Sequence, residues 1–155
     1  MRKWWFLLAL ALLAACNKQG QEAATTSAPP IGIRHFDPAS IAHGARLFEE
    51  HCAQCHGPQA QGHPDWQTPS EGKFAAAPPL NGTGNDWKRS RAELAVIIKN
   101  GVRRKSDNAD IMPSWKGRIG EHDIDDVINW LQSLWPAEVY EAWTKAHGAA
   151  PAPKS

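Results

Sequence analysis

An all-α fold is predicted for this chain of 155 residues by three observations. Four stretches carry apolar side chains at the three- and four-residue spacing of an amphipathic helix. No stretch alternates apolar and polar residues as a half-buried strand does. After the first helical stretch, residues 57–89 are rich in Gly, Pro, Asn and Gln and show neither period. The sequence therefore indicates one small helical domain with a long internal loop.

The first helix is expected to begin at Asp37, because Asp is a favoured N-cap residue and Pro38 suits the first helical position. An apolar stripe follows at spacings of four, three and four residues, formed by Ile41, Ala45, Phe48 and Cys52. The stripe leads directly into the sequence HCAQCHG at residues 51–57. This helix would therefore place a cysteine-rich motif at its C-terminal end.

Three further helices are expected after the long loop. In SRAELAVIIKNG, Ser90 and Glu93 form a predicted capping box, and the Asn-Gly pair is a stop signal. A third helix is expected over about residues 121–135, with Pro136 ending it. A weaker fourth is expected in AEVYEAWTKAHG, with Val139, Tyr140 and Trp143 on one face.

The chain opens with MRKWWFLLALALLAAC, in which two basic residues precede a short apolar run. This pattern predicts a signal peptide over residues 1–15, since the run is too short to span a bilayer comfortably. Its Leu-Ala-Ala-Cys end resembles the bacterial lipobox, so Cys16 is the predicted site of lipid attachment. An ordinary signal with a chance cysteine is the alternative. We expect an exported protein, lipid-anchored to the bacterial cell envelope membrane and facing the periplasm, with the choice between inner and outer membrane left open.

The remaining boundaries follow from composition. Residues 16–36 lack periodicity and are predicted to be a flexible tether. The folded domain is expected at 37–136, and a C-terminal extension at 137–155 would hold a short helix and then a disordered tail. The formal net charge of +1 excludes a strongly basic nucleic-acid binder, so no nucleic-acid partner is expected.

Three chemistries compete for the CAQCH motif. A redox dithiol would need a thioredoxin-like βαβ context with the pair at a helix N-terminus, which is missing here. A structural zinc site would need a second pair of ligands, and the other histidines are scattered singly. Haem attachment fits, because each thiol can form a thioether with the porphyrin and the next histidine lies under the iron. Cys52 and Cys55 are therefore the predicted attachment sites, and His56 is the first axial ligand.

The long loop supports a cofactor independently of the motif. A structureless loop of this length is unusual inside a compact domain. The four helices also supply few large apolar residues for a core. Both features are accounted for if a large, flat, apolar cofactor fills the centre of the domain.

The sixth iron ligand is predicted by elimination. A low-spin electron-transfer haem usually takes Met or His as its second axial ligand. Met1 would leave with the signal peptide, so Met112 is the only methionine left in the mature chain. It lies in a predicted loop, and Pro113 biases it toward an extended backbone. His43 and His122 remain the rival ligands.

The domain resembles the class I, monohaem c-type cytochromes, here in a lipoprotein form. The resemblance spans roughly residues 38–136 and rests on GARLFEEHCAQCHG, PPLNGTG, IIKNGV, MPSW and IDDVINWLQSLWP, in that order. It implies a small cytochrome c fold, with three to five helices around one covalently attached haem c. It also implies that Gly44 meets the Trp130–Leu131 region where the first and last helices cross, that the Pro78 carbonyl accepts a hydrogen bond from His56, and that Leu80 lies on the porphyrin.

The resemblance implies a one-electron carrier rather than an enzyme, because a haem with two protein ligands has no open position for a small-molecule substrate. We expect a membrane-tethered shuttle between redox partner proteins. The alternative is a haem c subunit through which electrons enter a larger oxidase or dehydrogenase complex. A haem sensor and a copper-handling protein are the remaining alternatives.

Overall fold

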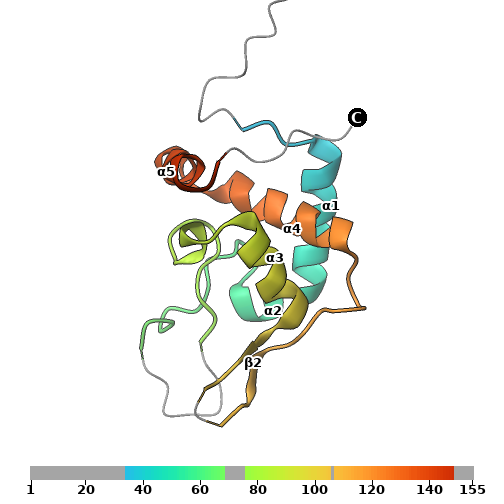
Figure 1. Cartoon of the computed structure of the whole chain (residues 1–155), viewed down its shortest axis with the longest axis vertical. Coiled ribbons are helices and arrows are strands. Elements are labelled where there is room, and N and C mark those ends of the chain that lie inside the picture. The colour runs from blue at the N-terminus through green and yellow to red at the C-terminus, as the bar shows by residue number, and fades with distance from the viewer. Residues whose placement is uncertain (1–33, 69–75, 106, 149–155) are drawn as a thin grey trace, which may run out of the picture.

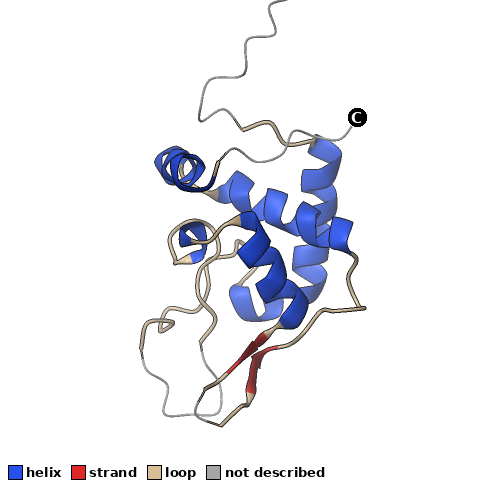
Figure 2. Cartoon of the chain, viewed as in Figure 1, coloured by secondary structure: helices blue, strands red, loops and turns tan. Residues whose placement is uncertain are grey.

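The computed structural model describes residues 34–68, 76–105 and 107–148. Five α-helices lie in this part of the chain, together with one short 3₁₀ turn and a small two-stranded sheet (Figures 1 and 2). The predicted all-α class and the cytochrome-like arrangement of helices are therefore confirmed. The predicted signal peptide, Cys16 and most of the predicted tether lie outside the described residues, as does the end of the C-terminal extension.

Helix α1 (Pro38–His51) begins as predicted, with Asp37 Oδ1 accepting the N–H of Ala39 at 3.0 Å. It crosses helix α4 (Glu121–Leu134), and the two helices form the main helix pair of the domain (Figure 1). The short helix α2 (Ala53–His56) follows one residue after α1 ends. The motif is therefore carried on a helical turn that continues from α1.

The crossing of α1 and α4 differs from the expected contact. A side chain at Gly44 would meet the backbone of Asp126 and Val127, with its Cβ only 2.5 Å from the carbonyl carbon of Asp126. The glycine therefore lies one turn earlier along α4 than the expected Trp130–Leu131 region. The Trp130 ring instead packs on Phe48, one turn after Gly44, with ring centroids 4.5 Å apart. At the crossing point itself, the two backbones are too close to admit a side chain at Gly44. The large side chains of Phe48 and Trp130 pack one turn away from it.

Helix α3 (Arg91–Asn100) has the predicted capping box between Ser90 and Glu93. The chain then leaves through Gly101, which has φ +70°. The next residues form a hairpin that the sequence did not predict, in which β1 (Val102–Arg103) pairs antiparallel with β2 (Asp110–Met112). Strands of two and three residues are too short to show an alternating pattern, which explains why this region was predicted to be a loop.

Helix α5 (Ala137–His147) follows α4 after a sharp corner at Trp135 and Pro136. Its Tyr140 and Trp143 pack with Trp135 in a buried aromatic cluster, as the predicted apolar face requires. The Trp143 indole also donates a hydrogen bond to the carbonyl of Arg89, 2.8 Å away and close to the 3₁₀ turn η1 (Asp86–Lys88). Helix α5 is therefore part of the packed domain.

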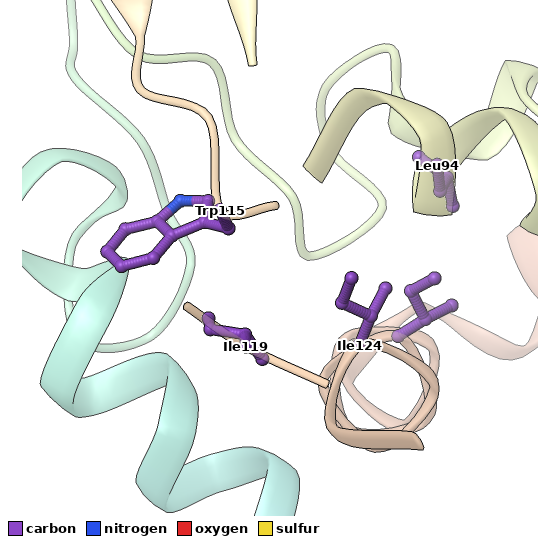
Figure 3. Close-up of a cluster of buried hydrophobic side chains, with 5 residues drawn as sticks. Leu94, Trp115, Ile119 and Ile124 are labelled. Atoms are coloured by element: carbon purple, nitrogen blue, oxygen red, sulfur yellow. The ribbon is translucent and has the colours of Figure 1, made fainter. Parts of the chain in front are cut away.

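Two further buried clusters form the rest of the core. One joins α3, α4 and the segment between the hairpin and α4, and it contains Leu94, Trp115, Ile119, Ile124 and Ile128 (Figure 3). The other lies around the α1–α4 crossing and contains Phe48, Ala60, Val127 and Leu131. Ile98 of α3 packs against both clusters. None of the described helices is long and apolar enough to cross a membrane.

Candidate functional site

The two cysteines of the motif lie on one helical turn but in different environments. The backbone N–H groups of Cys55 and His56 both donate to the carbonyl of Cys52, at 3.1 and 3.0 Å. Cys52 is half-buried and packs against the cluster around Phe48, whereas Cys55 is exposed. Both thiols are free. The turn therefore presents two thiols and one imidazole within five residues, close to apolar packing.

The burial of Cys52 sets the protonation state of its thiol. Burial, reinforced by the nearby Cys55, raises the pKa of the Cys52 thiol to about 11. Reactive cysteines of the dithiol class have a lowered pKa, because the thiolate is the nucleophile. Cys52 therefore keeps its proton at neutral pH and is not itself a nucleophile of that class.

The His56 ring is buried and its orientation is fixed by one hydrogen bond. His56 is only 8% exposed, and Nδ1 of its ring lies 2.9 Å from the carbonyl oxygen of Pro78. Because a carbonyl oxygen can only accept, Nδ1 carries the proton and Nε2 keeps its lone pair. The hydrogen bond that the resemblance implied is therefore confirmed.

The same surroundings keep the His56 imidazole neutral. Burial lowers the pKa of His56, and the hydrogen bond to Pro78 opposes this shift only in part. Metal binding requires the neutral ring, so a lowered pKa favours coordination at neutral pH. A ring with its Nδ1–H held by a backbone carbonyl is the usual arrangement of a metal-binding histidine.

Met112 lies at the end of β2 and not in a loop, which corrects the expected local structure. Its side chain is half-buried and packs against the cluster around Trp115 and Ile124. The backbone of Met112 lies against Gly101, since a Cβ added at Gly101 would overlap the Met112 carbonyl oxygen. A thioether packed among apolar side chains suits a soft axial ligand for haem iron.

The two rival ligands are both directed at another group. His43 Nδ1 lies 2.8 Å from Oδ2 of the buried Asp126, where α1 crosses α4. His122 Nε2 lies 3.7 Å from the same oxygen, and its side chain is 88% exposed. Their contacts with Asp126 supply a structural reason for both histidines. Met112 is therefore the better candidate of the three for the sixth position.

A zinc site finds no support in this geometry. Structural zinc needs about four ligands, usually Cys and His. In residues 34–68, 76–105 and 107–148, no three His, Cys, Asp or Glu side chains are placed to hold a metal ion together. The candidate donors of the described chain are two thiols and one imidazole on the turn Cys52–His56, and the thioether of Met112 at the end of β2. This donor set fits a covalently bound haem.

The structure adds contacts that sequence reasoning missed. Trp115 packs on His51 with ring centroids 5.0 Å apart, and it lies in the same cluster that receives Met112. The loop after His56 also returns to the segment around Pro78 through backbone hydrogen bonds, including Leu80 N–H to Ala60 O at 2.8 Å. Trp115 could have been suspected from its place in MPSW, but the loop contacts involve only backbone atoms and leave no side-chain pattern.

The comparisons with known proteins agree with this geometry. The family described as "Cytochrome C oxidase, cbb3-type, subunit III" matches residues 39–131. A cbb3-type cytochrome c oxidase subunit CcoP of Azospirillum brasilense is 33% identical over 106 residues, which cover 67% of this chain and 32% of the relative. A subunit FixP of Bradyrhizobium sp. (strain ORS 278) is 32% identical over 93 residues, which cover 59% of this chain and 26% of the relative.

The match is confined to part of each relative. The chain spans only about a third or less of the length of these curated relatives. No solved structure matches the chain significantly.

Proposed function

The chain belongs to the family "Cytochrome C oxidase, cbb3-type, subunit III" and binds c-type haem, and we propose that it carries single electrons into an oxidase complex of that type. The observation that carries this proposal is the buried His56 ring, whose Nδ1–H is held by Pro78 while Nε2 is left to bind iron. Two thiols lie on the same helical turn as this ring. No other described part of the chain combines these groups.

The residues that would hold the haem follow from the donor set. Cys52 and Cys55 would form the two thioethers, and His56 and Met112 would be the axial ligands. The bound haem supplies an iron that changes by one electron between its ferric and ferrous states. The protein keeps both ligands in place, excludes water with apolar side chains and fixes the His56 ring. With both axial positions filled by protein, the subunit transfers electrons without itself being an enzyme.

Two functions were expected from the sequence, and the relatives favour the second. An independent shuttle and a subunit that receives electrons for a larger complex need the same haem site, so the site alone does not separate them. The relatives are named as subunits of cbb3-type oxidases. We therefore place an oxidase complex, and the redox protein that donates to it, as the partners of this chain.

Membrane attachment through Cys16 is the second part of the proposal. The motif that supports it is the Leu-Ala-Ala-Cys sequence after the apolar segment. About 15–20 tether residues would give a reach of roughly 20–25 Å, enough for the domain to move over a membrane surface. A lipid anchor facing the periplasm would keep the domain close to a membrane-embedded oxidase.

The proposal is tested first by spectroscopy on the full chain, produced in a host that attaches haem to exported proteins. Sharp ferrous bands, together with the weak ferric near-infrared band of a methionine–iron bond, are the expected result. A c-type spectrum without that band would keep the haem and overturn Met112 as the ligand. Absence of covalent haem would overturn the proposed function.

A second experiment tests the partner. Affinity purification from membranes of a cell that makes the tagged protein should recover the other oxidase subunits in constant proportion. Recovery of the haem protein alone, with intact membranes and mild detergent, would favour the independent shuttle.

A Cys16→Ser variant, which cannot carry the lipid, should move from the membrane fraction to the soluble periplasmic fraction.

A further inference from the structure

The loop that follows His56 is bonded to the backbone on both sides of Pro78. Gly62 N–H donates to the carbonyl of His56 at 2.7 Å. His63 N–H donates to Ala77 at 2.9 Å, and Ala60 accepts from Leu80 N–H at 2.8 Å. The residue that accepts the His56 hydrogen bond therefore lies between two anchored neighbours.

The direction of the Pro78 carbonyl is restricted by its own chain. The proline ring fixes φ of Pro78, and the following Pro79 confines Pro78 to an extended conformation. Pro79 is buried, so this segment cannot turn freely toward solvent. The carbonyl oxygen can leave the His56 ring only if the whole Pro78–Pro79 peptide moves.

Two glycines lie against the backbone of this segment, Gly62 at the Pro78–Pro79 peptide and Gly84 at the next peptide, which carries the Pro79 carbonyl. Gly62 has φ +69°, and an added Cβ would lie 2.6 Å from the carbonyl carbon of Pro78 and closer still to the nitrogen of Pro79. Gly84 is buried, and an added Cβ would overlap the carbonyl oxygen of Pro79 and lie 3.1 Å from its carbon. Real Cβ atoms essentially never come within 3.0 Å of such atoms, so a side chain at either position must displace the backbone of the Pro78–Leu80 segment.

We propose that Gly62 and Gly84 are positioning residues for the axial histidine, because their close approach to the backbone of Pro78 and Pro79 holds this segment at the place where Pro78 accepts from His56. This inference rests on the proposed function, in which His56 binds the haem iron. The hydrogen bond makes the ring a more electron-rich ligand, which stabilises ferric iron. Movement of the peptide would weaken the bond, expose Nδ1–H to exchange and raise the reduction potential.

The experiment compares alanine variants of the haem-loaded full chain. Gly62→Ala adds both a contact and a left-handed backbone penalty. Gly84→Ala adds the contact alone, because its φ is not in the left-handed region. Gly117→Ala is the matched control, since Gly117 has φ +74° and nothing lies within 4 Å of an added Cβ. The readouts are exchange of the His56 Nδ1–H with deuterated water, followed by NMR of the ferric protein, and the reduction potential.

The expected result is faster Nδ1–H exchange in Gly62→Ala and Gly84→Ala, by roughly tenfold, the effect of losing one hydrogen bond. Their reduction potentials should rise, whereas Gly117→Ala should match the wild type in both measurements. If Gly62→Ala does not accumulate, the same measurements are made on Gly84→Ala and on the milder Pro79→Ala, which frees the Pro78 backbone. Both variants should show faster Nδ1–H exchange and a higher reduction potential.

Wild-type exchange and potential in both contact variants, even with a lower melting temperature, would overturn the inference and leave the glycines a purely structural role. A wild-type chain with no covalent haem would overturn the proposed function first, and the inference with it. The spectrum of the wild-type protein therefore distinguishes the two failures.

Discussion

The His56 side and the Met112 side of the site are supported by different kinds of structure. His56 is buried on a helical turn, and its ring is bonded to a segment that is itself held by backbone hydrogen bonds and two prolines. Met112 ends a three-residue strand that pairs, within the described part of the chain, with a strand of two residues, and the register between them is irregular. Short, exposed hairpins open more readily than packed helical turns. The comparison indicates that His56 is held more firmly than Met112, the second proposed ligand.

Charge placement strengthens this contrast. The hairpin has ion pairs at its surface, such as Arg103 with Asp110 at 3.0 Å, and both side chains are more than 60% exposed. Exposed ion pairs of this kind stabilise a folded protein by about 1 kcal/mol or less. The His56 side is held by backbone hydrogen bonds and apolar packing.

Removal of the more firmly held ligand should have the largest effect. His56→Ala is expected to abolish the low-spin spectrum, although the thioethers of Cys52 and Cys55 can still form, because they do not depend on the imidazole. Optical spectroscopy and mass measurement of the intact chain separate the two events. A retained low-spin spectrum with unchanged bands would exclude His56 as an axial ligand.

Removal of Met112, the second proposed ligand, should have a smaller effect. Met112→Ala is expected to leave the haem attached, to lower the reduction potential and to open the iron to external ligands, since methionine sulfur raises the potential. Titration with imidazole and a redox titration measure both changes. His43→Ala and His122→Ala are the matched controls and should leave the potential unchanged. A potential unaffected in Met112→Ala would mean that another residue binds the iron.

Disturbing the hairpin behind Met112 should loosen this ligand without removing it. In Gly101→Ala, the added Cβ would lie 2.8 Å from Pro113 C and overlap the Met112 carbonyl, at φ +70°. Overpacking and left-handed strain together should lower stability by about 2–4 kcal/mol. Imidazole should then bind the ferric protein more tightly than in the Gly117→Ala control. Equal affinity in the two variants would show that the hairpin does not restrain Met112.

A buried carboxyl group away from both ligands provides the smallest test. Burial raises the pKa of Asp86, opposed by nearby backbone N–H groups and the Trp135 indole. Among the described residues, neither carboxylate oxygen makes a hydrogen bond of good geometry. The folded protein therefore holds this proton to higher pH than the unfolded chain, so folding stability falls as pH rises through the raised pKa.

Asp86→Asn should remove this penalty and stabilise the protein by about 1 kcal/mol at neutral pH. The gain should disappear at pH 3, where the carboxyl is protonated in both states. Thermal unfolding across pH measures the effect, with the exposed Glu141→Gln as control. A gain that persists at pH 3 would assign the effect to packing, and no gain at any pH would show that the buried charge is not destabilising.

The helices and the His56 half of the site were accessible from the sequence because their signals are local. Asp37-Pro38, the Ser90–Glu93 capping box and CAQCH each lie within a few residues, and each was found where expected. The hairpin was missed because its strands are too short to alternate. The part of α4 that Gly44 of α1 contacts depends on how two helices far apart in the sequence cross, and no local pattern records this.

The support around Pro78 illustrates a further limit. The proposed role of Gly62 and Gly84 depends on close approach to backbone atoms of Pro78 and Pro79. A single sequence gives a glycine no pattern that distinguishes such a role from an ordinary turn. The His56–Pro78 bond itself could be expected only because the sequence resembles a family in which that bond occurs.

The point at which the chain enters the domain has a mechanical consequence. Arg34 donates to the last carbonyls of α4, including Ser133 at 3.0 Å, and its guanidinium lies 4.8 Å from the Tyr140 ring centre. The described chain thus begins at the end of the molecule where α5 lies, opposite the β1–β2 hairpin (Figure 1). Any membrane anchor upstream of Arg34 would therefore be connected to the domain at this end. The domain would then turn about that end, and the hairpin carrying Met112 would lie at the opposite end of the domain (Figure 1).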